Sequence, residues 1–298
     1  MKEKKVYALG FFDGVHRGHQ ALLAACVRMA TQLDAIPAAI TFDRHPQSLF
    51  ISNPPALINT NADRDALLHH YGIRHIHRLS VSEDVMSTPW QNFLENLLSD
   101  CQGGFVCGDD FRFGHKGQGD CEKLAEFCRQ RDIPCTIVSE QTMDGQRISS
   151  THIRKCIEQG DIAQANAFLG HPHLLTGTVM PGRQLGRTIG IPTANLWIPQ
   201  GVVIPKFGVY ACRVHIGRDS YLAVTNVGMR PTVSGENLTV EPWILDFEGD
   251  LYGVELQLAF RARLRDEACF PSLDALRQQI EEDIRMARKC FSHGVSPF

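Results

Sequence analysis

Residues 5–42, KVYALGFFDGVHRGHQALLAACVRMATQLDAIPAAITF, contain the pattern that decides the fold of the first half of the chain. The apolar runs 5–12 and 36–42 are rich in strand-forming residues, and each predicts a buried strand. Between them, apolar residues recur at three- and four-residue steps, which indicates an amphipathic helix that starts near His19. Strand, glycine-containing turn, helix and strand form a βαβ unit. It predicts a parallel sheet with a ligand at the carboxyl end of the first strand.

The same alternation of strand-like and helical segments continues to about residue 170. Further strands are expected at 105–107 and 135–138, with helices at 90–98, 122–131 and 151–169. The pattern therefore predicts one doubly wound α/β domain, which we place at residues 1–172.

The sequence changes character after Gly170. Gly and Pro punctuate residues 170–177, and short runs with strand alternation follow, such as 254–260. Turn-forming residues separate these runs, which predicts a small antiparallel sheet or barrel. A last helix is expected after Ser272, whose hydroxyl can cap it. This second domain is predicted to span residues 173–298.

The overall composition limits the classes of protein to which the chain can belong. Hydrophobic residues make up 43% of the 298 residues and charged residues 21%, which is typical of globular domains and excludes disorder over most of the length. Neither a transmembrane run nor a signal-peptide pattern is seen. The net charge of −3 argues against a nucleic-acid coat protein. Ten scattered cysteines predict free thiols, as in the cytoplasm.

Two histidines, His16 and His19, flank Gly18 at the predicted start of the first helix. A helix N-terminus carries unpaired N–H groups and the positive end of the dipole, so this position suits phosphate. Two imidazoles there can donate hydrogen bonds to charge that builds up on phosphate oxygens. No obvious nucleophile is present, which favours direct transfer between two bound substrates. A metal pair or a packing role is the alternative.

Two loops of the first domain carry further candidates. His45 and Pro46 follow the second predicted strand, where they could equally form no more than a rigid turn. The loop 107–120 contains four glycines, and its Phe111 and Phe113 could flank a planar ring. A surface loop with buried aromatic anchors is the alternative interpretation.

The segment 148–154, ISSTHIR, is a third candidate. Ser149 or Ser150 could cap the helix that follows. Arg154, one turn into that helix, could bind phosphate through two parallel hydrogen bonds. A simple helix cap is the alternative, and both roles are compatible.

The second domain contains the glycine-rich stretch 182–195, GRQLGRTIGIPTAN, which is not a Walker loop. Closely spaced glycines can let backbone N–H groups hold phosphate, with Arg187 adding positive charge. The Thr193 hydroxyl and the Asn195 amide oxygen are ligands suited to Mg²⁺. A glycine hairpin with polar turn residues is the alternative.

Together these segments resemble the bacterial bifunctional riboflavin kinase/FAD synthetase family. GFFDGVHRGH is similar to the first motif of the HxGH-type nucleotidyltransferases, and TFDRHP, CGDDFRFGHKGQGD and ISSTHIR follow in the family's order. GIPTANL resembles the PTAN motif of riboflavin kinases, and FGVYA, TNVGMRPTV, LDFEGDLYG and LRDEACFPSLDAL also match. The resemblance implies an α/β Rossmann-like nucleotidyltransferase domain, followed by a small antiparallel β-barrel with a closing helix.

The resemblance implies two ATP-dependent reactions, phosphorylation of riboflavin to FMN and adenylylation of FMN to FAD with release of pyrophosphate. Riboflavin, FMN and ATP would be bound with Mg²⁺, and no nucleic-acid or membrane partner is expected. Glu241 occupies the position of the family's catalytic base. The implied catalytic residues are Glu241, His16, His19 and Arg154; the phosphate-binding residues are Gly10, Phe11, Asp13, Gly18, Ser149, Ser150, Thr151, Gly182, Gly186, Arg187, Thr193 and Asn195, the last two also binding Mg²⁺; and the flavin-binding residues are His45, Asp110, Phe111, Phe113 and Arg265.

Two departures from the family pattern concern the second domain. The family usually has a histidine two residues after the glutamate, whereas Pro242 and Trp243 follow here. Proline removes a ladder donor, so an edge or bulged strand is expected at this point. Cys269 replaces a basic residue that is common before the phenylalanine of LRDEACF. A homologue with one inactive half, or a non-catalytic regulator that binds flavin or nucleotide, therefore stays open as an alternative.

Overall fold

A computed structural model of the protein describes residues 4–98, 103–181, 192–232 and 235–292. The chain divides by packing into an N-terminal unit, residues 1–57 and 61–150, and a C-terminal unit, residues 58–60 and 151–298. We describe each unit separately. The predicted division by activity at residue 172 is a different boundary, and it stays a prediction.

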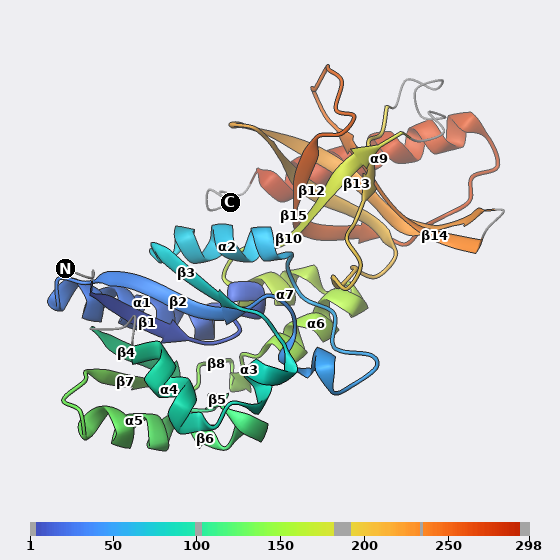
Figure 1. The fold of residues 1–298 in the computed structure, drawn as a ribbon. Helices are drawn as coiled ribbons and strands as arrows, with labels where there is room; N and C mark the ends of the chain where they lie inside the picture. Colours follow the sequence, from blue (N-terminus) through green and yellow to red (C-terminus); the bar gives the residue numbers. More distant parts are fainter. Residues whose placement is uncertain (1–3, 99–102, 182–191, 233–234, 293–298) are drawn as a thin grey trace. The chain divides into compact units, whose positions relative to one another are not determined.

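A five-stranded sheet with the order β3-β2-β1-β4-β7 forms the centre of the N-terminal unit (Figure 1). Every neighbouring pair in it is parallel, which confirms the predicted doubly wound α/β fold. The chain reverses its direction of winding between β1 and β4, and ligands of such sheets bind at this point. The strands are β1 (Lys5–Leu9), β2 (Ile36–Phe42), β3 (His75–Leu79), β4 (Gly104–Gly108) and β7 (Cys135–Val138).

Helices cover both faces of this sheet. Alternate strand residues such as Tyr7, Leu9 and Phe105 pack with the buried sides of α4 and α5 on one face. Helix α1 contacts β1, β2 and β4, and the Cys26 thiol on its buried side reaches the Val6 carbonyl at 3.3 Å. The helices are α1 (Arg17–Gln32), α2 (Asn61–His70), α3 (Glu83–Ser87), α4 (Trp90–Leu98) and α5 (Cys121–Arg129).

Short elements extend the loops at the carboxyl ends of the strands. They form single turns of 3-10 helix and two small antiparallel hairpins. These elements are η1 (Asp13–Val15), η2 (Pro46–Leu49), β5 (Arg112–Phe113), η3 (His115–Gly117), β6 (Gly119–Asp120), β8 (Thr142–Met143) and β9 (Gln146–Arg147).

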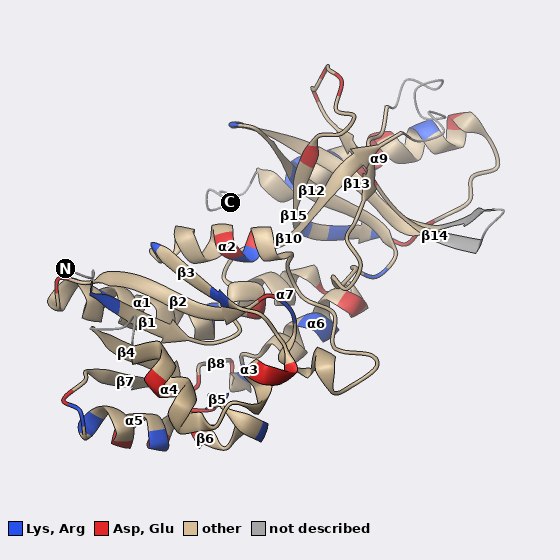
Figure 2. Cartoon of the chain, viewed as in Figure 1, with Lys and Arg blue, Asp and Glu red and all other residues tan. Residues whose placement is uncertain are grey.

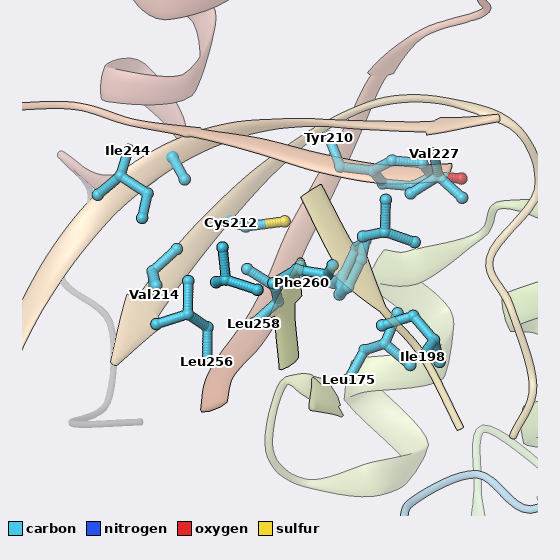
Figure 3. Close-up of a cluster of buried hydrophobic side chains, with 14 of the residues drawn as sticks. Leu175, Ile198, Tyr210, Cys212, Val214, Val227, Ile244, Leu256, Leu258 and Phe260 are labelled. Atoms are coloured by element: carbon cyan, nitrogen blue, oxygen red, sulfur yellow. The ribbon is translucent and has the colours of Figure 1, made fainter. Parts of the chain in front are cut away.

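A closed six-stranded barrel, in the order β10-β11-β14-β13-β12-β15, forms the centre of the C-terminal unit, and the described residues of this unit include the helices α6, α7 and α9. All of its strand pairs are antiparallel, as predicted. Figure 3 shows its apolar interior, where Tyr210, Leu258 and Phe260 are fully buried. The strands are β10 (His173–Met180), β11 (Asn195–Trp197), β12 (Gly208–Ile216), β13 (Asp219–Thr232), β14 (Gly235–Ile244) and β15 (Glu255–Arg265).

Helix α9 (Leu273–Phe291) packs on the outer face of the barrel, as the predicted closing helix. The Ser272 hydroxyl accepts a hydrogen bond from the Ala275 N–H, so the predicted cap is present. Ala287 of this helix is buried against Val209, Ala211 and Val224 of the barrel wall.

The helical pattern predicted over 151–169 is two helices, α6 (Ser150–Gln159) and α7 (Ile162–Leu169). Gly160 has φ +81°, a conformation that ends a helix at little cost, and Asp161 caps the next one. Apart from Ser150, both helices belong to the C-terminal unit. Across the described residues, no helix combines the length and apolarity needed to cross a membrane. Basic and acidic residues are interspersed along α5 and α9 (Figure 2), in keeping with the small net charge.

Candidate active sites

A pocket of about 340 Å³ opens in the N-terminal unit at the carboxyl ends of β1, β2, β4 and β7. This is the edge at which the chain reverses its winding. The pocket brings together many of the residues predicted for nucleotide and flavin binding. Its lining includes Gly10, Phe11, His16, Gly18, His19, Asp110, Phe111, Ser149 and Ser150.

His16 and His19 lie together at the start of α1. His16 is the N-cap residue, and its Nδ1 accepts a hydrogen bond from the His19 N–H at 3.3 Å. In its neutral form His16 therefore carries its proton on Nε2, where it can donate to a ligand. The two rings stack with centroids 3.7 Å apart. Burial, reinforced by the charges of His16 and Arg64, holds the pKa of His19 well below its usual value, so this imidazole is neutral at pH 7.

The turn between β1 and α1 has an unusual backbone that its surroundings hold in place. Phe12 and Val15 have φ +58° and +40°, which non-glycine residues seldom adopt. The Phe11 carbonyl accepts hydrogen bonds from Thr41 Oγ1 at 2.8 Å and from Arg64 Nη1 at 3.2 Å. Because Arg64 is only 2% exposed, burial lowers the pKa of its guanidinium to about 10. These contacts fix the backbone in front of the histidine pair.

Asp13 is part of this turn and is only 2% exposed. Its carbonyl accepts a hydrogen bond from the Ser150 hydroxyl at 2.9 Å. The contact ties the first motif to the end of the unit, where Ser149 and Ser150 line the pocket. Thr151 and Arg154 lie on α6 in the C-terminal unit, so their place relative to the pocket stays a prediction.

A charged group that the sequence did not single out lies at the mouth of the pocket. Arg147 Nη2 is 2.5 Å from Asp110 Oδ2, and Arg147 Nε is 3.0 Å from Glu140 Oε2. Asp109 Oδ2 accepts a hydrogen bond from the Glu140 N–H at 3.0 Å. The signal for Arg147 was its position directly before ISSTHIR. In the structure, Arg147 contributes a guanidinium group to the lining of a pocket that is expected to bind anions.

The two predicted aromatic residues of the 107–120 loop differ in position. Phe111 lines the pocket, whereas Phe113 is 5% exposed and packs in the core, stacked on Phe111 with centroids 5.5 Å apart. Phe113 therefore supports Phe111 from behind. His45 caps η2 through Nδ1 and meets the Phe11 ring edge-on, at 5.2 Å between centroids. It is absent from the lining of the pocket, although its neighbour Pro46 is part of it.

The second group of predicted residues comes together on the barrel. The Ala194 N–H donates to the Pro242 carbonyl at 3.0 Å, and Leu196 pairs with Val240. This ladder places the PTAN segment beside the strand that carries Glu241. Gly182, Gly186 and Arg187 lie outside the described residues.

Strand pleating determines which side chains share a face. Leu196, Val240 and Ile244 point into the barrel core, so residues one step away along each strand point outward. Asn195 of β11 and Glu241 of β14 therefore lie on the same outer face, on neighbouring strands. Thr193 comes two residues before Asn195, across Ala194, which packs against the core. The hydroxyl, amide and carboxylate groups of these three residues can act on one substrate.

The predicted edge or bulge at Pro242 is wrong. Strand β14 lies inside the closed barrel, and its register with β13 runs from Ala223–Ile244 to Thr232–Gly235 without a shift. The Leu245 N–H donates a hydrogen bond to the Leu222 carbonyl of β13. Because every second residue of an antiparallel strand forms its backbone hydrogen bonds to the same neighbour, residues 243 and 241 of β14 also face β13. The backbone of Pro242 instead faces the PTAN segment, where its carbonyl accepts the hydrogen bond from Ala194. Its missing N–H therefore does not interrupt the β13–β14 ladder.

Arg265, a predicted flavin-binding residue, is held by α9. Its guanidinium makes three hydrogen bonds of 2.8–3.1 Å to the carboxylate of Asp283, which is 1% exposed. Its Nη1 also donates to the Asp266 carbonyl at 3.0 Å. Arg265 thus fixes the start of the loop between β15 and α9, and its flavin role stays a prediction.

Comparisons with known proteins agree with this architecture. The FAD synthetase family matches residues 1–152, and the riboflavin kinase family matches residues 169–291. Proteins named bifunctional riboflavin kinase/FMN adenylyltransferase are 34% identical in Listeria monocytogenes (97% of this chain, 93% of that protein) and 35% identical in Escherichia coli K12 (97% and 94%). A Streptococcus pneumoniae crystal structure, described as a macrolide-efflux protein, has a TM-score of 0.87 and 31% identity over 97% of this chain and 95% of that one. Since two domain families and close relatives account for nearly the whole length, the chain belongs to the bifunctional riboflavin kinase/FMN adenylyltransferase family.

Proposed function

We propose that this chain performs both reactions of its family, with riboflavin, FMN and ATP as substrates. The barrel would phosphorylate riboflavin, and the nucleotidyltransferase domain would adenylylate the FMN that results. The observation that carries the proposal is the presence of two separate groups of reactive side chains. One lines the pocket around His16 and His19, and the other lies on the outer barrel face around Glu241.

In the kinase reaction, Glu241 is the general base. Its carboxylate accepts the proton of the terminal ribityl hydroxyl, whose oxygen attacks the γ-phosphorus of ATP while ADP leaves. Thr193 and Asn195 present oxygen atoms on the same face, and these suit Mg²⁺. When bound there, the ion would neutralise charge on the phosphates. Gly182, Gly186 and Arg187 are proposed to hold the phosphate chain of ATP.

In the adenylyl transfer, an FMN phosphate oxygen attacks the α-phosphorus of ATP and pyrophosphate leaves. No covalent enzyme intermediate is needed. His16 and His19 donate hydrogen bonds to the charge that builds up, assisted by the N–H groups at the start of α1. Ser149, Ser150, Thr151 and Arg154 are proposed to hold the phosphates. His45, Asp110, Phe111 and Phe113 are proposed to form the flavin side of the site, Phe113 by supporting Phe111.

We also propose a cytoplasmic location. The nine cysteines among the described residues are free thiols, which suits a reducing compartment.

The test of the proposed function is incubation with riboflavin and Mg·ATP, followed by chromatography of the flavins. Both FMN and FAD are expected. FMN alone would mean that the adenylyltransferase half is inactive. If neither flavin formed, the chain would be a flavin- or nucleotide-binding protein without these activities.

A further inference from the structure

The outer face of the barrel continues beyond Glu241 to the next strand. In register, Glu241 of β14 is directly opposite Asn226 of β13. Ala223 and Val227 are buried in the barrel core, so Asn226 points outward like Glu241. Side chains paired in this way lie about 4.5–5.5 Å apart at Cβ. The Asn226 amide is therefore a direct neighbour of the base.

A second carboxylate lies against the same stretch of β13. The Asn226 Nδ2 donates a hydrogen bond to Glu267 Oε1 at 3.0 Å. Glu267 also covers the backbone of Gly228, where a Cβ atom would overlap its carboxylate. Any larger residue at position 228 would push Glu267 away, so the glycine keeps this place open for it.

The loop that carries Glu267 is anchored on both sides. Arg265, two residues earlier, is clamped to buried Asp283, and Ser272 caps α9 a few residues later. Glu267 itself is exposed to solvent, and one oxygen of its carboxylate accepts the hydrogen bond from Asn226. Its carboxylate therefore has oxygen lone pairs left for a ligand, in a fixed position.

The order of the strands separates the two substrates. Asn195 is on β11 with Thr193 just before it, Glu241 is on β14, and Asn226 is on β13. The base therefore lies between the proposed nucleotide side and the Asn226–Glu267 side. A carboxylate repels phosphate but accepts hydrogen bonds from hydroxyl groups. Asn226 is on the strand next to Glu241, and adjacent strands are about 4.8 Å apart. A sugar-alcohol chain has several hydroxyls at shorter spacing than this. If its terminal hydroxyl lies at Glu241, the following hydroxyls can therefore reach Asn226 and Glu267.

We infer that Asn226 and Glu267 form a subsite for the sugar-alcohol hydroxyls of the acceptor flavin, on the side of Glu241 away from the nucleotide. This inference rests on the kinase activity proposed above. It makes Glu267 a specificity-determining residue, because a site built to bond hydroxyls discriminates strongly against a ligand that lacks them. The ring of the flavin is not required for this contact.

The experiment compares two flavins on the full-length protein. Riboflavin carries the sugar-alcohol chain, and lumiflavin has the same ring without it. Dissociation constants would be measured by quenching of flavin fluorescence, with kinase kinetics in parallel. Glu267→Ala should raise the Kd and KM for riboflavin about tenfold, as expected for loss of a hydrogen bond to a charged group. The Kd for lumiflavin and the KM for ATP should change less than about twofold.

A matched control is Glu255→Ala, which removes another exposed carboxylate of the barrel. It should leave riboflavin binding unchanged. Glu267→Gln keeps an acceptor for Asn226 and should give a smaller loss than Glu267→Ala. Equal weakening of riboflavin and lumiflavin, or unchanged riboflavin binding in Glu267→Ala, would overturn the inference. Wild-type protein that forms no FMN would instead overturn the proposed function, so the two failures are distinguishable.

Discussion

Both candidate sites are proposed to bind ATP, but the two sites are built in different ways. The site of the N-terminal unit is a pocket in which His16 is 7% exposed and buried Arg64 fixes the backbone of the first motif. The site of the barrel lies on an outer face, where strand pleating and register align Asn195, Glu241 and Asn226. Burial sets the protonation state of the first site, as the lowered pKa of His19 shows. The second depends on the register of three neighbouring strands.

The largest expected effect comes from removing the proposed base. Glu241→Gln keeps the shape of the side chain but cannot accept the proton, so FMN formation should fall by about 10²- to 10⁴-fold. The rate of FAD formation from supplied FMN should stay within about twofold of the wild-type rate, because this reaction does not use Glu241. Separate assays of the two half-reactions give both values. A kinase that keeps its rate would show that another group takes the proton.

The opposite variant should affect the pocket alone. His19→Ala removes a donor from the phosphate site, and FAD formation from FMN should fall by about 10²- to 10³-fold. FMN formation should be unaffected. His69→Ala, at an exposed position in the same unit, is the control and should change neither rate. Loss of both activities in His19→Ala would mean that the two sites are not separate.

A third prediction concerns stability rather than rate. Burial, and next the charge of His171, lower the pKa of His173 in the barrel to about 3, whereas the unfolded chain has the usual value near 6.5. Below the unfolded value only the unfolded chain takes up this proton, so the folded form is destabilised as pH falls. The loss should be about 1.4 kcal/mol per pH unit until pH nears the folded value.

Urea unfolding at pH 7, 6 and 5 tests this prediction. His173→Leu removes the proton site and keeps an apolar side chain beside Phe260, whose ring is 5.6 Å from that of His173. In this variant the unfolding free energy should fall less steeply with decreasing pH, by about 1.4 kcal/mol per pH unit. An unchanged pH dependence would show that His173 is protonated in the folded state.

The smallest expected effect is at the mouth of the pocket. Arg147→Met keeps the side-chain stem but removes the charge, and the KM for FMN or ATP in FAD formation should rise about tenfold. Arg129→Met, at an exposed position on α5, is the matched control. If KM is unchanged, Arg147 serves only its ion pairs with Asp110 and Glu140.

Several elements could be predicted from sequence because their apolar patterns are strong. The expected strands 36–42 and 135–138 and the helix 90–98 coincide with β2, β7 and α4. Helix α2 and strand β3 were not predicted. In β3, HIHRL, polar residues alternate with few apolar ones, because it lies at the edge of the sheet. Propensity and periodicity carry little information for such a segment.

The site residues show a similar limit. The order of the short motifs was enough to predict the functional residues of both sites, because these residues lie within the motifs or next to them. They are His16, His19, Thr193, Asn195 and Glu241. Buried Arg64 could not be found, since charged residues are rarely buried and its partners are backbone carbonyls far away in sequence. The Asn226–Glu241 pair depends on register, and the Asn226–Glu267 contact on a loop that returns to the barrel.

The most direct test of two separate sites is complementation between Glu241→Gln and His19→Ala, supplied with riboflavin and Mg·ATP. Either variant alone should make FAD at least about 10²-fold more slowly than wild type, because the first lacks the kinase base and the second lacks a transferase donor. An equal mixture of the two should form FAD, since FMN made by His19→Ala can be adenylylated by Glu241→Gln. FAD production by either variant alone at the wild-type rate, or a mixture that makes FMN but no FAD, would contradict the account.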